Sequence, residues 1–260
     1  MKLIANNHVV SVSALTINPT SESPLFPTTN LKNILRSKRY RSTSKTNQGI
    51  VFDFGSAVAV DAFVMLLPKE GVLNMTGGAT ITLQGNSSNS WGSPPVNENL
   101  TLNVDERQVS FFLPSTETYR YWRVYIDDTS AVGDYVEISK IILGPAVSIP
   151  LPQNGFKIGK TNNTKLSKND FGSVYADKYP VLKKLSLDWK TLLISEIEQL
   201  DDVYDSNGNH TPVYITLDEE SMLFNKDTYS IYGLLDDKFD KDHVSYNILD
   251  SSGFDITELN

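Results

Sequence analysis

The chain has 260 residues, of which 40% are apolar and 21% charged, and its formal net charge is −8. This composition is typical of a folded protein with one large or two ordinary domains, and it excludes an intrinsically disordered chain. The sequence contains no cysteine, which excludes a disulfide scaffold, a thiolate nucleophile and a zinc–thiolate site. No apolar run approaches the ~20 residues of a membrane helix, and the N-terminal residues do not form a secretory signal. We therefore expect a soluble protein that is made in the cytoplasm.

Short apolar or alternating runs recur through the first half of the chain, separated by turns rich in Asn, Ser, Gly and Pro. Runs of this length without a helical period predict an antiparallel β-sandwich. The predicted strands cover residues 9–17, 50–54, 57–67, 79–83, 100–104 and 108–113, followed by a closing strand pair within residues 119–144.

The closing strand pair carries the clearest pattern in the chain. Trp122, Val124 and Ile126 alternate with more polar residues, and a period of two predicts a strand with one face in a core and the other near water. We therefore interpret Trp122 as a structural core residue, and Trp189 in the second half likewise.

Three prolines between Pro145 and Pro152 indicate a connection between domains, because proline stiffens the chain and removes a hydrogen-bond donor. The sequence thus predicts one domain at 1–146 and another at 147–260. In the second domain we expect strands at 156–160, 165–166, 173–176, 181–189, 211–217 and 228–235. Apolar residues at helical spacing predict a single packed helix at 191–204, capped by Thr191 or Asp188 and ended by Asn207-Gly208-Asn209.

Charge is distributed unevenly along the chain. From Glu196 to the end there are 16 acidic residues against three lysines, a net of −13, whereas the preceding residues carry a net of +5. The basic groups of the first domain include a cluster without any acid: Lys32, Arg36, Lys38, Arg39, Arg41 and Lys45. Nucleic-acid binding is disfavoured, because the whole chain repels phosphate. We expect an assembly contact in which this cluster meets the acidic end of another copy or of another protein.

The sequence offers no convincing catalytic site. The three histidines, His8, His210 and His243, lie in polar or turn-like stretches without a Gly-x-Ser-x-Gly elbow. The carboxylate pairs at 201–202, 219–220 and 236–237 are interpreted as solvated turns. We therefore predict no catalytic residue, no cofactor and no enzyme activity.

The segment 205–209 places oxygen-bearing side chains at alternate positions, as calcium loops do. An EF-hand loop requires glycine at its sixth position and glutamate at its twelfth. Here Gly208 is fourth and Thr216 twelfth. We interpret the segment as a helix-ending turn, and no metal site is predicted.

Trp91 lies in a polar loop and is the best candidate for a glycan contact, with Tyr40 and Arg41 as possible helpers. Sugar sites combine an aromatic platform with hydrogen-bonding groups for the hydroxyls. In the alternative interpretation, Trp91 packs against its own loop or against a neighbouring subunit.

Two segments of the first domain carry a family resemblance. The run Gly49-Ile-Val-Phe-Asp-Phe-Gly55 precedes the apolar segment 60–67, and Tyr121–Ile126 is followed by the closing 135–144 strand. Both resemble the galactose-binding-like, discoidin-type β-sandwich. Many secreted members of that family have a disulfide, which this chain lacks.

The whole chain resembles the tail structural proteins of long-tailed bacteriophages. The matching motifs are Asn30-Leu31 and Arg41-Ser42 ahead of the Asp-Phe-Gly strand, and the run from Asp127 to Gly144. The resemblance implies a mainly β protein, with a galactose-binding-like sandwich followed by a β-rich, tail-tube-like or distal-tail-like domain that has one packed helix.

The same resemblance implies a non-enzymatic virion protein at the tail tip or baseplate, made in the host cytoplasm. Its partners would be other copies in a ring, other tail proteins and host-surface glycan, without nucleic acid or membrane insertion. The alternative that the sequence leaves open is a soluble carbohydrate-binding adhesion module.

Overall fold

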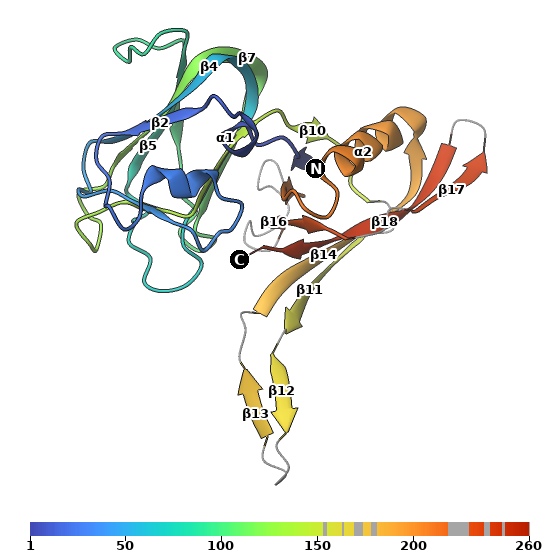
Figure 1. The fold of residues 1–260 in the computed structure, drawn as a ribbon. Coiled ribbons are helices and arrows are strands. Elements are labelled where there is room, and N and C mark those ends of the chain that lie inside the picture. Colours follow the sequence, from blue (N-terminus) through green and yellow to red (C-terminus); the bar gives the residue numbers. More distant parts are fainter. Residues whose placement is uncertain are drawn as a thin grey trace. The chain divides into compact units, whose positions relative to one another are not determined.

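The computed structural model describes residues 1–152, 155–162, 164–168, 174–177, 181–217, 229–236, 240–245 and 248–259. The chain forms two compact units, one of residues Asn6–Ala146 and the other of Met1–Ala5 together with Val147–Asn260. The fold is mainly β, with antiparallel sheets in both units (Figure 1). The domains expected at 1–146 and 147–260 differ from this division in the first five residues.

The first unit is an antiparallel β-sandwich. Its main sheet has the order β2-β4-β7-β5-β6, β9 pairs with β4, and β3 pairs with β8. The elements are α1 (His8–Ser11), β2 (Thr16–Pro19), the 3₁₀ helix η1 (Thr28–Lys32), β3 (Tyr40–Arg41), β4 (Gln48–Leu66), β5 (Thr80–Asn86), β6 (Val96–Leu100), β7 (Gln108–Asp127), β8 (Glu137–Ile138) and β9 (Lys140–Gly144).

Strands β4 and β7 are longer than the sequence predicted, because each joins two predicted strands. In β4 the register shifts between Asp53 and Val58, around Gly55, whose φ of 77° suits a glycine. Beyond this irregularity the residues that follow pair with β7 on one side and with β9 on the other. The two parts of the closing 119–144 segment therefore do not pair with each other: β7 pairs with β4 and β5, and β9 pairs with β4.

The strand predicted at 9–17 is wrong in its first part. Residues His8–Ser11 form the short helix α1, because the Asn7 side chain accepts a hydrogen bond from the backbone N–H of Val9 at 3.1 Å. An Asn at this position satisfies a donor that the first helical turn leaves open. The strand begins only at Thr16.

The core of the sandwich contains the inward-facing residues of β4, β5 and β7. Trp122, Val124 and Ile126 are completely buried, which confirms the interpretation of that alternation. They pack in one cluster with Phe52 and Phe63. Burying an apolar side chain of this size contributes about 1.5–3 kcal/mol.

The second unit is built on a sheet with the order β10-β1-β15-β16-β18-β14-β11, and β17 pairs with β18. Its elements are β1 (Lys2–Ile4), β10 (Val147–Ser148), β11 (Phe156–Asn162), β12 (Lys165–Lys168), β13 (Val174–Asp177), β14 (Val181–Leu193), α2 (Ile194–Asn207), β15 (Val213–Thr216), β16 (Ser230–Leu235), β17 (Asp240–Ser245) and β18 (Ile248–Glu258). Residues 1–5 belong here because β1 pairs with both β10 and β15.

Helix α2 begins three residues later than predicted. Thr191 and Asp188, the proposed caps, lie in β14, which pairs with β18 as far as Leu193. The Glu196 carboxylate accepts the backbone N–H of Leu193 at 2.8 Å and so closes the first turn. Ile197, Leu200 and Val203 face the core as the helical spacing predicted. Within the described residues no helix is long and apolar enough to cross a membrane.

Candidate functional site

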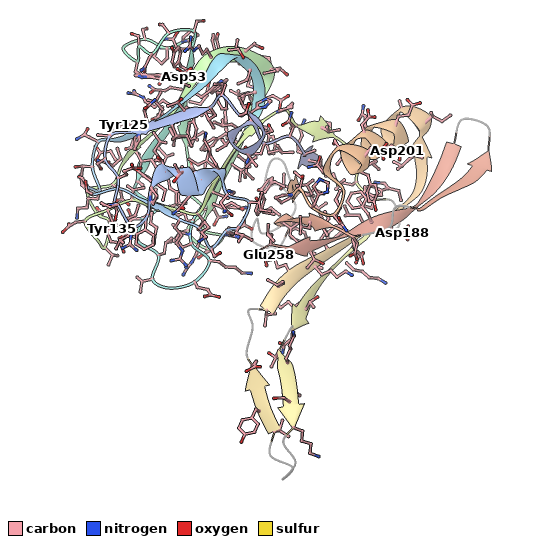
Figure 2. The ribbon with its side chains drawn as sticks, viewed as in Figure 1. Asp53, Tyr125, Tyr135, Asp188, Asp201 and Glu258 are labelled. Carbon is pink, nitrogen blue, oxygen red and sulfur yellow. The ribbon has the colours of Figure 1, made fainter. Side chains whose placement is uncertain are left out.

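A cluster of polar and aromatic side chains lies on the outer face of the sandwich sheet. On β7, Arg123 and Tyr125 point away from the core, because they alternate with the buried Trp122 and Val124. The loop between β5 and β6 adds Trp91, which is partly exposed. We call Trp91, Gln84, Asn97, Arg123 and Tyr125 the outer-face cluster; Tyr125 is labelled in Figure 2.

The strand register places three of these residues in one row. Gln84 on β5 is opposite Arg123 on β7 and opposite Asn97 on β6. The Nε of Arg123 donates to the Gln84 side-chain oxygen at 2.7 Å, and the Gln84 amide nitrogen donates to the Asn97 side-chain oxygen at 2.8 Å. This chain of hydrogen bonds holds the guanidinium plane in one orientation.

Two aromatic rings flank the Arg123 guanidinium. Its carbon lies 4.7 Å from the ring centre of Trp91 and 5.5 Å from that of Tyr125, distances at which a cation is attracted to an aromatic face. Trp91 is fixed by its own loop, since its ring N–H donates to Asn89 at 2.9 Å. The Tyr125 hydroxyl donates to Asn47 at 2.7 Å. The rings are therefore held in place without a ligand.

Partial burial lowers the pKa of the Arg123 guanidinium, and the nearby Tyr125 opposes that shift. A guanidinium nevertheless remains protonated in proteins. Only its Nε is hydrogen-bonded within the described residues, so its two terminal NH₂ groups can donate to a ligand. Among the described residues, the Asn97 side chain is hydrogen-bonded through its oxygen, and its NH₂ group is a further donor for a ligand. The cluster thus offers aromatic surface together with donors that suit an oxygen-rich ligand.

Of the three residues predicted for glycan contact, only Trp91 lies in this cluster. Tyr40 is wrong as a contact residue: its side chain is 0% exposed, its hydroxyl donates to the Ser21 carbonyl oxygen at 2.8 Å, and burial raises the pKa of that hydroxyl. Strand β3 has only two residues. An alternation that short cannot be recognised in the sequence, so the burial of Tyr40 was not predicted.

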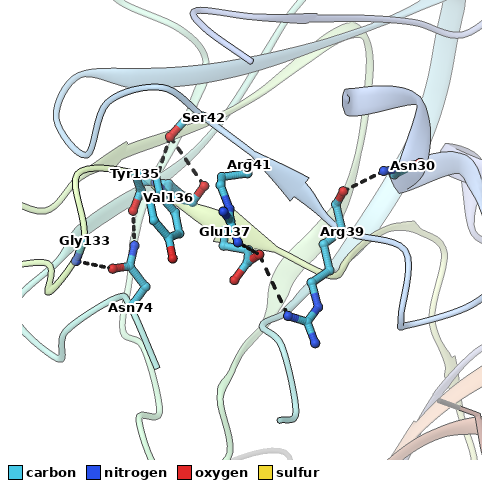
Figure 3. A network of polar contacts seen from close by, with 9 residues as sticks. All are labelled: Asn30, Arg39, Arg41, Ser42, Asn74, Gly133, Tyr135, Val136 and Glu137. Carbon is cyan, nitrogen blue, oxygen red and sulfur yellow. Dashed lines mark hydrogen bonds and ion pairs between the residues drawn. The ribbon is translucent and has the colours of Figure 1, made fainter. Parts of the chain in front are cut away.

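Arg41 is held inside a network of polar contacts (Figure 3). Its NH₂ group donates to the Glu137 carboxylate at 2.8 Å. Its guanidinium carbon lies 4.3 Å from the Phe26 ring centre and 4.2 Å from that of Tyr135. Such a stacked and paired arginine stabilises strand β3 and its neighbours, and the network that holds it does not include Trp91.

Most of the predicted basic cluster is likewise engaged within the sandwich. Arg36 is buried and donates to the Leu67 carbonyl oxygen at 3.0 Å, while Lys32 donates to the Leu15 carbonyl oxygen at 2.5 Å. Lys45 contacts the Ala131 carbonyl oxygen at 3.3 Å. Arg39 lies 3.9 Å from Glu137. Only Lys38 among the six is fully exposed, so these residues do not form a shared free cationic surface.

The remaining candidates have structural surroundings. The ring Nε2 of His8 donates to the Ala59 carbonyl oxygen at 2.9 Å, and burial lowers the pKa of His8. The segment 205–209 contains the end of α2, where Gly208 has a φ of 51° and donates to the Tyr204 carbonyl oxygen at 2.7 Å. In the part of the chain that the structure describes, no three His, Asp or Glu side chains gather as a metal site would require. The carboxylate pair 219–220 and Asp237 lie outside the described residues, as does the side chain of His243.

Sequence reasoning missed Arg123, Gln84, Asn97 and Tyr125. The signal was available only for β7, where Arg123 and Tyr125 occupy the water-facing positions of the alternation. Gln84 and Asn97 join them through cross-strand register, which a single sequence does not reveal.

The solved structures that resemble the chain cover about half of it. No protein-family model and no curated protein matches the chain. Among solved structures, the family 32 CBM from NanJ of Clostridium perfringens, in complex with galactose, has a TM-score of 0.43 and 12% identity over 53% of this chain and 97% of its own. The lectin domain of lectinolysin, complexed with Lewis B antigen, has a TM-score of 0.44 and 9% identity over 53% of this chain and 95% of its own. At these identities and TM-scores, no ligand or activity is transferred to this chain.

Proposed function

We propose that the sandwich is a non-catalytic carbohydrate-binding module, and that the outer-face cluster contacts the glycan. The observation that carries the proposal is the arrangement of Trp91 and Tyr125 around a guanidinium that Gln84 holds in place. Pyranose rings present apolar C–H faces that pack on aromatic rings, and their hydroxyls accept hydrogen bonds from fixed donors. The structural neighbours include carbohydrate-binding modules and a lectin domain, which agrees with the alternative left open by the sequence.

The donors of the cluster favour one class of glycan. Arg123 offers two NH₂ groups on one planar fork, and such a fork matches a carboxylate in bidentate geometry. Asn97 adds a neutral donor along the same row. We therefore expect glycans that carry a carboxylate to bind more tightly than their neutral counterparts.

A glycan array of the full chain, followed by calorimetric titration, tests this function. Trp91→Ala and Arg123→Gln should each weaken binding about tenfold or more, because each removes a central contact of a small site. Tyr175→Ala is the matched control, since Tyr175 is a 57% exposed aromatic residue in the other unit. The proposal fails if no glycan binds, or if binding is the same in the wild-type chain and in the Trp91→Ala variant.

A second candidate function is that of a structural subunit of a bacteriophage tail, at the tail tip or baseplate. Its sequence motifs are described above, and one structural observation favours assembly of some kind: apolar side chains are exposed on a two-stranded hairpin of the second unit. Large exposed apolar residues grouped on one element are typical of contacts with other proteins.

Electron microscopy of particles that carry the labelled chain tests the tail function. Incorporation at one end of a tail would support it, and a chain that is absent from purified particles would refute it. Reversing the charge of Arg36, Arg39 and Arg41 would not test this function cleanly. Arg36 and Arg41 make hydrogen bonds that stabilise the sandwich, so their loss would affect folding as well as assembly.

A further inference from the structure

Strands β12 and β13 form a hairpin, which we call the arm. Lys165 pairs with Asp177 and Lys168 with Val174, and every side chain of both strands is exposed. Figure 1 shows the arm beyond the end of β11 and β14, away from helix α2. A two-stranded hairpin without a packed face is at best marginally stable in water. Among the described residues, no packed face covers either side of the arm, although such a face normally stabilises a hairpin.

The arm exposes apolar groups together with positive charge. Leu166 is 71% exposed and Val174 62% exposed; the register places both on the face that also carries Ala176 and Lys168. From Phe156 to Leu185 the sequence has seven lysines and two aspartates. Lys168 on this face is exposed and has no ion-pair partner within the described residues, whereas Lys165 lies on the opposite face, across from Asp177.

Helix α2 presents the complementary chemistry. Its 14 residues contain five acidic side chains and no basic one. Glu198, Asp202 and Asp205 are exposed along the side opposite the buried Ile197 and Leu200, and they too have no ion-pair partner in the described part of the chain. At the start of the helix, Leu193 and Ile194 are exposed by 59% and 37%. We call Leu193, Ile194, Glu198, Asp202 and Asp205 the helix face; Asp201, beside it, is labelled in Figure 2.

We propose that the arm of one copy docks on the helix face of a second copy. Leu166 and Val174 would cover Leu193 and Ile194, while Lys168, on the same face of the arm, would pair with Glu198 or Asp202. The partner is a second copy because one chain carries both halves of the match and its own arm points away from its own helix. The contact deepens the assembly function proposed above and does not depend on glycan binding.

The proposed contact joins two different surfaces, so each copy uses its arm on one neighbour and its helix face on another. Such a head-to-tail contact produces a closed ring or an open filament according to the rotation between copies. A contact of two like surfaces would instead stop at a dimer. The geometry therefore predicts oligomers larger than two.

Sedimentation velocity of the full chain tests the contact through charge reversal. The wild-type chain should form oligomers that become smaller at high salt. The arm variant Lys168→Glu and the helix variant Glu198→Lys/Asp202→Lys should each lower the association constant at least about tenfold, because like charges then face each other. An equimolar mixture of the two variants should associate again, since the acidic arm of one matches the basic helix of the other.

Lys38→Glu/Lys69→Glu, which reverses two charges in the sandwich unit, is the matched control and should associate as the wild type does. Circular dichroism of each variant establishes that it is folded. The contact is wrong if the wild-type chain is monomeric at ~100 μM, or if mixing the two variants does not restore association. Association that disappears on nuclease treatment would also overturn it, because nucleic acid would then occupy the basic arm. If the wild-type chain associates and neither reversal matters, this contact is wrong while the assembly function stands.

Discussion

The two units use their charged residues in opposite ways. In the sandwich, Arg36, Arg41 and Lys140 are bound by carbonyl or carboxylate oxygens of the same unit. In the second unit, the lysines of the arm and the acids of the helix face are exposed and without ion-pair partners among the described residues. A run of like charges in a sequence can therefore stabilise a fold from within or remain available for a partner, and only the surroundings of each residue decide which.

The largest expected effect is on the free energy of unfolding, when a buried aromatic residue of the sandwich is compared with an exposed one of the second unit. Trp122→Ala should lower the free energy of unfolding by about 3–5 kcal/mol, because it empties a fully buried site in the sandwich core. Tyr175→Ala on the arm should change it by less than about 0.5 kcal/mol. Urea unfolding followed by fluorescence measures both, and similar losses at the two positions would contradict the comparison.

A smaller effect is expected for the arginine at the centre of the polar network. Arg41→Met should cost about 2–3 kcal/mol, because Glu137, with a side chain only 8% exposed, loses its closest cationic partner. Lys168→Met, in the arm, should be close to neutral. Thermal unfolding of the two variants beside the wild type tests the difference, and an equally stable Arg41→Met variant would show that the network is dispensable.

Lys140 should give the sandwich a pH-dependent stability. Its amine is completely buried and donates to the Leu31 carbonyl oxygen at 2.9 Å, and burial lowers its pKa to about 7. Between pH 7 and the unfolded pKa of 10.5 the unfolded chain binds the additional proton, so this group makes the free energy of unfolding rise with pH. The increase should be about 2 kcal/mol from pH 7 to pH 9.

Lys140→Met should remove that increase, which denaturant unfolding at several pH values would measure. Lys184 in the second unit is the contrasting amine. It lies 2.6 Å from Asp255, which raises its pKa, so Lys184→Met should leave the slope between pH 7 and pH 9 unchanged. A slope that survives Lys140→Met would assign the effect to another group.

The smallest effect concerns the end of helix α2. Gly208→Ala should destabilise the second unit by about 1 kcal/mol, because φ is 51° there and an added Cβ is strained in that conformation. Gly92→Ala, in the sandwich loop, is the control, since its added Cβ meets nothing within 4 Å and its backbone is not in the left-handed region. Hydrogen exchange of the helix amides would detect the difference, and equal protection in both variants would contradict it.

The sequence predicted the features that depend on local pattern. The alternation around Trp122 and the helical spacing of Ile197, Leu200 and Val203 identify buried faces, because neighbours along the chain determine them. The antiparallel β-sandwich of the first unit follows from short alternating runs of the same local kind. By contrast, the start of α2 depends on how far β14 pairs with β18. The sequence of one strand alone does not reveal how far it pairs with a distant strand.

The candidate site was predicted only in part for the same reason. Trp91 could be found, since a tryptophan in a polar loop is unusual by itself. Arg123, Gln84 and Asn97 come together through two strand registers, and Tyr40 and Arg36 turn inward through loops that have no repeating pattern. Residue type identified which groups could bind a ligand, whereas long-range pairing decided which of them face solvent.

The pairing of β1 with β10 and β15 has a consequence for biosynthesis. Lys2 pairs with Ser148 and with Thr216, so the whole sandwich is an insertion between two adjacent strands of the second unit. On the ribosome, β1 emerges before the sandwich, and it can pair with β10 only after the inserted module has been translated. An insertion whose two ends leave from neighbouring strands can also be exchanged for another module during evolution, while the scaffold that receives it keeps its fold.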